Sequence, residues 1–291
     1  MSTTKLQSLP EIPLPDAGAF AISPSGEFAV VCQTSSGKIS IIDTRSGKIL
    51  KTISFPRQPT GVEFSRNGMF LYVVLDRDAI VEFFTSDWRE SKRITWTEIW
   101  TKIVADNDGG HVYAVSPRGI DELDVARLEI VRSFAYPGLR NSSALNSGNF
   151  LCVVTFEKFI VFDIQGWGAK LERKIESGSL VEIDPGRARA FVGQNLRRNV
   201  EIYDLASGDS LGSIPGNDIV QGIALTPSGS LAFIISYEGA NMAVYDVDGE
   251  VKKIEDVSIG GDPRHVVVAR DGARVYVTNG IALKVFEVSR V

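Results

Sequence analysis

The chain contains few of the residues from which reactive centres are usually built. Its 291 residues include only two histidines and two cysteines, which cannot supply an ordinary zinc or haem site. Metalloprotease, CxxC, phosphate-loop, nucleophile-elbow and dinucleotide motifs do not occur in a usable context. We therefore predict no cofactor. A divalent metal is the less favoured alternative, because rim carboxylates come from separate segments without a loop motif.

Long apolar runs and helical periodicity are also missing. No apolar run approaches the roughly 20 residues that a membrane span needs. Hydrophobic residues make up 44% of the chain, and they occur in short β-runs without a helical period. We predict an all-β protein with almost no helix and no membrane partner.

Positive charge is scarce and scattered. The formal net charge is −5 and the densest basic spot is the pair Arg197-Arg198, whereas nucleic-acid binding favours a basic stripe. We expect no nucleic-acid partner. The N-terminal residues 1–13 lack the apolar segment of a secretory signal, which favours a cytoplasmic location.

What the chain does contain is a repeated cassette. The segment Asp262–Gly280 holds two β-runs joined by an Asp-Gly turn, which is typical of an antiparallel hairpin. Turns of this kind recur at 23–26, 65–68, 106–109, 226–229 and 269–272, with degenerate copies at 146–148 and 184–186. A third run then ends near an acidic residue such as Asp43 or Asp204, and a fourth run follows. Four strands in roughly 40 residues indicate a β-propeller blade.

Seven copies fit the chain, and the last one stops at its third strand. The segment Lys5–Pro10 precedes the first copy and belongs to no blade. We predict that it supplies the missing outer strand, which would close the ring and remove two sheet edges. The result is one domain over 1–291, with blades at about 17–58, 59–99, 100–137, 138–177, 178–218, 219–261, and 262–291 plus 5–10.

The cysteines agree with this plan. Cys32 and Cys152 fall in the second strands of the first and fourth copies. Blades so far apart hold them beyond the ~7 Å Cα separation of a disulfide. We expect buried, reduced thiols.

The last copy carries a family signature. Tyr276–Asn279 reads YVTN, Pro263 precedes it, and Asp271-Gly272 forms its turn. The chain therefore resembles the YVTN-repeat family of seven-bladed propellers over nearly its whole length. The resemblance extends distantly to lactonase-type propellers and streptogramin lyases; the lyases use a His and a bound Mg²⁺ near the channel mouth for elimination. Here Arg264 stands where that family's pattern would place its His.

The repeat register also predicts which residues meet. Inner strands line the central channel, and each inner strand begins on the face where the loop between the second and third strands opens. The first or second inner-strand positions are Gly18, Thr60, Thr101, Asn141, Ser179, Gln221 and Arg264. This mostly polar ring with one cation can orient an anionic or carbonyl-bearing ligand. Alternatively, it binds only channel water.

His265 departs from the repeat, because the second and sixth copies keep glycine in its slot, at Gly61 and Gly222. Its unperturbed pKa near 6.5 makes it the best general acid or base candidate. A hydrogen bond to a neighbouring blade explains it equally well. The other histidine, His111, is read as structural.

Two tryptophans form a second anomaly. The connection before the third copy contains Trp96, Glu98 and Trp100, and Tyr237 stands on the same rim. Aromatic side chains there could wall a ligand pocket or anchor a partner protein. Packing between blades is the slightly favoured explanation for Trp96.

Two functions follow. In the first, the protein is a redox-cofactor-independent enzyme of lyase, lactonase, isomerase or cyclase type. Arg264 would then polarise a carbonyl, His265 would move a proton, and Trp96 with Trp100 would hold the apolar part of a small-molecule ligand. In the second, the rim is a non-catalytic platform that binds a protein partner, and fold alone does not choose between them.

Overall fold

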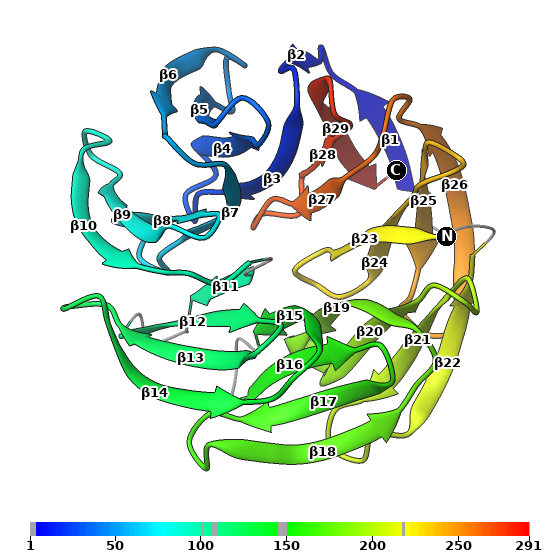
Figure 1. The fold of residues 1–291 in the computed structure, drawn as a ribbon. Coiled ribbons are helices and arrows are strands. Elements are labelled where there is room, and N and C mark those ends of the chain that lie inside the picture. Colours follow the sequence, from blue (N-terminus) through cyan, green and yellow to red (C-terminus); the bar gives the residue numbers. More distant parts are fainter. Residues whose placement is uncertain (1–3, 100–101, 106–109, 145–149, 217–218, 291) are drawn as a thin grey trace.

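A computed structural model describes residues 4–99, 102–105, 110–144, 150–216 and 219–290. Seven antiparallel sheets stand as blades around a central axis (Figure 1). The blades of the first half contain β3 (Ala17–Ile22), β4 (Phe28–Gln33), β5 (Lys38–Asp43) and β6 (Ile49–Ser54); β7 (Pro59–Phe64), β8 (Phe70–Leu75), β9 (Ala79–Phe84) and β10 (Glu90–Thr95); β11 (Lys102–Ala105), β12 (His111–Ser116), β13 (Gly119–Asp124) and β14 (Glu129–Ala135).

The remaining blades follow the same order from the channel outward. They contain β15 (Leu139–Ala144), β16 (Phe150–Thr155), β17 (Lys158–Asp163) and β18 (Gly168–Lys174); β19 (Gly178–Asp184), β20 (Arg189–Gln194), β21 (Asn199–Asp204) and β22 (Ser210–Pro215); β23 (Val220–Leu225), β24 (Leu231–Ser236), β25 (Asn241–Asp246) and β26 (Lys252–Ser258); β27 (His265–Val268), β28 (Arg274–Thr278) and β29 (Ala282–Arg290). One 3₁₀ turn, Pro185–Arg187, interrupts the β-structure described here. The predicted all-β, seven-bladed fold is confirmed.

The repeated turns form because their glycine reaches a backbone conformation that other residues avoid. Gly26 has a φ of 75° and its N–H donates to Ser23 O at 2.8 Å. Gly272 repeats this geometry with a φ of 72° and an N–H bond to Ala269 O. Only glycine takes such positive φ values at no steric cost. The predicted turns at 106–109 and 146–148 lie outside the described residues.

The acidic residues at the ends of third strands cap the next turn. Asp43 Oδ1 accepts hydrogen bonds from the N–H of Ser46 at 2.6 Å and from its hydroxyl at 2.7 Å. Asp204 accepts from the N–H groups of Ala206 and Ser207. These bonds favour the charged form and lower the pKa of both carboxyls. Both carboxylates therefore stabilise the turn that follows the third strand.

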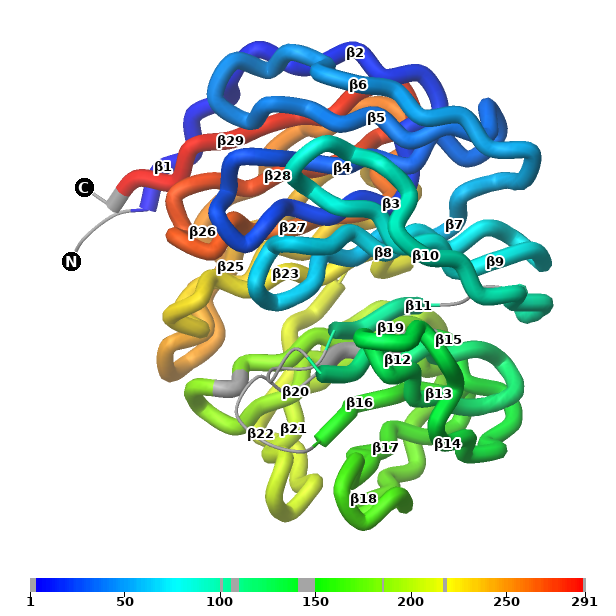
Figure 2. Tube along the Cα trace, turned by 90° about the vertical axis from the view of Figure 1, so that its left-hand side faces the viewer, coloured from blue at the N-terminus to red at the C-terminus, as the bar shows by residue number. Residues whose placement is uncertain are grey.

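The N-terminal strand closes the ring. β1 (Thr4–Ser8) pairs antiparallel with β29, from Thr4 opposite Arg290 to Ser8 opposite Phe286, and Figure 2 shows the two strands side by side. This confirms the predicted closure. A second short strand that was not predicted, β2 (Ile12–Pro13), pairs with the beginning of β29. It forms because Ile12 and the following Leu14 are buried in the cluster between the last and first blades.

The hydrophobic core is divided among the gaps between neighbouring blades. Each described cluster joins two adjacent sheets; one contains Val30 and Ile41 of the first blade with Leu71 and Val81 of the second. Cys32 in that cluster and Cys152 elsewhere are free and buried, as predicted. Burial raises the pKa of Cys32 to about 12. No helix in the described part of the chain is long and apolar enough to cross a membrane.

One position seals the gap between most neighbouring blades. It follows the outermost strand, and its N–H donates to the carbonyl of a residue in the loop between the second and third strands. We call it the crossover position. Its occupants are Phe55, Trp96, Tyr136, Ile175, Gly216 and Ile259. All except Gly216 have a large side chain that packs into the cluster between its own blade and the next.

This position corrects the assignment of Trp96 to a ligand-binding wall. Its side chain is only 3% exposed and packs in a cluster with Tyr72, Val74 and Leu123. The crossover geometry places the indole between the second and third blades, where a ligand in the channel cannot reach it. Packing between blades, the slightly favoured explanation, is the observed one.

Replacing Trp96 by alanine should lower the free energy of unfolding by about 3–5 kcal/mol, because the truncation leaves a large cavity between two blades. Denaturant titration measures the loss. Leu196→Ala is the control, since that side chain is 73% exposed. Equal midpoints for the two variants would contradict the sealing role.

Deleting residues 1–8 should lower the melting temperature clearly, because the deletion removes β1 and each lost ladder hydrogen bond is worth about 1 kcal/mol net. It also exposes the edge of β29, which favours association between molecules. Deleting only residues 1–3 is the control. Thermal unfolding and light scattering that do not distinguish the two deletions would argue against closure by β1.

Candidate functional site

A cavity of about 630 Å³ opens at the centre of the ring. It is lined by inner strands of the first, second, third, fourth and seventh blades and by the loop after β4. The residues that can bind or react are Asp16, Thr34, Ser35, Thr60, Glu63, Lys102, Arg140, Arg264 and His265. We call this space the central cavity.

Three cations line the central cavity, and within the described part of the chain only one of them forms an ion pair. Arg264 is held by Asp262, with Nε to Oδ2 at 3.1 Å, and by Asp16, with Nη1 to Oδ1 at 3.5 Å. Lys102 and Arg140 are exposed and make no ion pair with a described residue; Arg140 lies over the ring of Phe156. In a chain of net charge −5, this lining favours an anionic ligand.

Glu63 is the residue whose importance the sequence did not reveal. It lies on β7, half-buried, and lines the same cavity. Burial raises the pKa of Glu63 to about 7; Glu182 adds to the increase, while Lys102 and Arg270 oppose it. A carboxyl with this pKa gives and takes protons near neutral pH. A carboxylate within an otherwise apolar inner-strand run, Pro59–Phe64, was the available signal.

The pKa of His265 is shifted in the opposite direction to that of Glu63. Its side chain lines the central cavity and is exposed to it. Burial lowers the pKa of His265 to about 4, and Lys102 and Arg264 contribute to the decrease. The imidazole is therefore neutral at pH 7. It can donate or accept a hydrogen bond, but it does not act as an acid at this pH.

The other predicted residues divide into two groups. Thr60 lines the central cavity, and its Oγ1 is buried without a hydrogen-bond partner among the described residues. Ser179 lies outside the lining and donates its hydroxyl to Gly193 O at 3.2 Å. Gln221 is half-buried on β23, outside the cavity, and Tyr237 is 52% exposed in the loop after β24.

Arg140 also lines the cavity, in the fourth blade. The pairing of β15 with β16 shifts between Leu139 and Asn141 and leaves Arg140 unpaired between them. The second blade has the same shift between Pro59 and Gly61, where Thr60 lines the cavity. The backbone of Asn141 pairs with Val154, and its predicted role in ligand binding stays a prediction. Trp100 and Thr101 lie outside the described residues.

Replacing Glu63 by glutamine should change the pH dependence of stability. The folded-state pKa lies above the unfolded value of about 4.3, so the bound proton stabilises the fold at low pH and this contribution is lost as the pH rises through 7. Relative to the unchanged protein, Glu63→Gln should gain up to about 3 kcal/mol between about pH 5 and about pH 8.

The measurement is chemical unfolding at several pH values, with the exposed Glu238→Gln as control. His265 affects stability in the opposite direction below about pH 6.5, but it does so equally in both proteins and cancels in the difference. A pH-independent difference would show that Glu63 ionises normally.

Comparison with solved structures places the fold among known propellers. Kuenenia stuttgartiensis hydrazine synthase matches with a TM-score of 0.83 and 20% identity, over 96% of this chain and 96% of that chain. The β-propeller domain of Myceliophteria thermophila Cps50 (Swd1) matches with a TM-score of 0.83 and 11% identity, over 98% of this chain and 100% of that chain. At these identities the likeness shows the fold alone.

Comparison of sequences finds no relative. No protein-family model matches the chain, and neither does any curated protein. The resemblance to YVTN repeats and to streptogramin lyases therefore stays a prediction.

Proposed function

We propose that the protein binds a small organic anion in the central cavity and catalyses a proton transfer on it without a redox cofactor. The observation that carries this proposal is that Lys102 and Arg140, which form no ion pair with a described residue, line one cavity together with Glu63, whose pKa is raised to about 7. Positive charge favours binding of the anion, and the carboxyl supplies a base matched to neutral pH.

The charged and polar groups of the cavity have different roles in this proposal. Lys102 and Arg140 neutralise the carboxylate or phosphate of the ligand. Arg264, oriented by Asp16 and Asp262, directs its guanidinium toward a carbonyl oxygen, where it stabilises developing negative charge. His265 adds a neutral hydrogen bond.

Glu63 then removes a proton from the carbon next to that carbonyl and returns it to the product. Loss of a β-substituent gives elimination, and return of the proton to another carbon gives isomerisation. These two reaction types, lyase and isomerase, use every charged group of the cavity. Hydrolysis of a lactone would also need a positioned water.

Replacing Lys102 and Arg140 together by alanine should weaken binding of small carboxylates or phosphates by about a hundredfold or more, because each of the two charged hydrogen bonds contributes about 1.5–3 kcal/mol. Calorimetry against a panel of such anions measures the change. Arg118→Ala is the matched control, since Arg118 is exposed in a neighbouring loop and pairs with Glu98. Unchanged affinity in the double variant would refute the anion site.

A second observation favours a protein partner on the same face. Loops between second and third strands in four consecutive blades expose large apolar side chains, namely Phe156, Leu196, Tyr237 and Ile281. Backbone bonds tie these loops to the beginnings of inner strands, as from Tyr237 N to Ile219 O. A rim of this kind suits a docking partner, and a binding platform is the second candidate function.

A further inference from the structure

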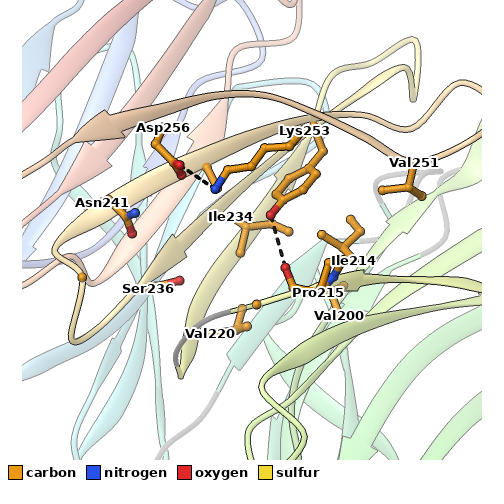
Figure 3. Close-up of a pocket in the computed structure, with 14 residues that line it drawn as sticks. Val200, Ile214, Pro215, Val220, Ile234, Ser236, Asn241, Val251, Lys253 and Asp256 are labelled. Atoms are coloured by element: carbon orange, nitrogen blue, oxygen red, sulfur yellow. Dashed lines mark hydrogen bonds and ion pairs between the residues drawn. The ribbon is translucent and has the colours of Figure 1, made fainter.

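A second cavity, distinct from the central one, lies between the outer parts of the fifth and sixth blades. Its volume is about 440 Å³, and Figure 3 shows side chains of both blades around it. Its apolar walls are Val200 and Ile214 of the fifth blade and Ile234 and Val251 of the sixth. We call this space the inter-blade cleft.

The cleft exists because one crossover residue has no side chain. Gly216 occupies the crossover position of the fifth blade, where its N–H donates to Arg198 O at 2.8 Å. It also lines the cleft. At the equivalent point, Phe55, Trp96 and Ile259 fill the gap to the next blade. The cleft is therefore a space of the kind that a branched or aromatic side chain occupies elsewhere in the ring.

Polar groups stand at the edge of this apolar space. Lys253 Nζ lies 2.5 Å from Asp256 Oδ2, and the two side chains are 41% and 47% exposed. The side chains of Ser236 and Asn241 line the cleft and make no hydrogen bond to another described residue. Figure 3 shows all four around the same opening.

The wall beside these groups is held in place. The Tyr245 hydroxyl donates to Pro215 O at 3.2 Å and so links the two blades across the cleft. Burial raises the pKa of Tyr245, which keeps the phenol a neutral donor. The cleft therefore has one fixed apolar side and one side with a cation, an anion and two polar side chains that bond to no other residue in the described part of the chain.

We propose that the inter-blade cleft binds an apolar α-amino acid, whose side chain takes the place of the missing crossover residue. The amino-acid carboxylate pairs with Lys253 and its ammonium group with Asp256, so each protein charge exchanges its neighbour for a partner on the ligand. Ser236 and Asn241 complete the hydrogen bonds. Two opposite charges next to an apolar space match a zwitterion better than a simple anion, which Asp256 would repel.

The first test fills the cleft from within. L-phenylalanine and L-isoleucine are titrated into the unchanged protein, Gly216→Phe and Gly216→Ala, with calorimetry as the readout. The unchanged protein and Gly216→Ala should bind, and Gly216→Phe should not, because its own side chain occupies the space. Binding that survives Gly216→Phe, or no binding to the unchanged protein at millimolar concentrations, overturns the proposal.

The second test removes the charges and does not depend on a bulky residue folding into the cleft. Lys253→Met and Asp256→Asn should each weaken binding of L-phenylalanine by about tenfold or more, and N-acetyl-phenylalaninamide, which lacks both charges, should bind as weakly. Equal binding of the charged and uncharged probes overturns the zwitterion site. Binding only by a peptide with an internal phenylalanine does so too, and indicates a protein partner instead.

Discussion

The structure depends on contact between the faces of neighbouring sheets. A four-stranded blade has no core of its own, and its apolar side chains, such as Val30 and Leu71, are buried only because another blade covers them. A ring gives every blade two neighbours, provided that its ends meet. The pairing of β1 with β29 makes them meet, and it joins the two ends of the sequence in a single sheet.

The ring also explains why the central cavity is chemically unusual. Inner strands bring side chains from separate blades close together, and desolvation disfavours the charged forms of Glu63 and His265 there. The same cause therefore raises the pKa of Glu63 and lowers that of His265. In the proposed reaction, proton transfer near neutral pH therefore falls to the carboxyl of Glu63, although a histidine has the more suitable pKa in free solution.

Because the blades repeat one pattern, a residue that departs from the pattern can be recognised. The crossover position seals the gap after most blades, so Trp96, which looks like a ligand-binding residue in the sequence, is a structural one. The same rule identifies Gly216 as a missing seal and connects it with the inter-blade cleft. One position of the repeat therefore accounts both for stability and for a candidate binding site.

The sequence by itself determined the seven-bladed ring, the turns and the closing strand, because these depend on local chemistry repeated at a regular spacing: a glycine with positive φ, a capping aspartate, an unpaired N-terminal strand. It also indicated Arg264, His265 and Thr60 as cavity residues. Only the tertiary structure decided that Arg140 lines the cavity, since Arg140 lies unpaired in the irregular start of β15, between Leu139 and Asn141. Only the tertiary structure revealed Glu63, because burial and charged neighbours from distant strands shift its pKa. Neither the burial nor the neighbours can be predicted from a local sequence pattern.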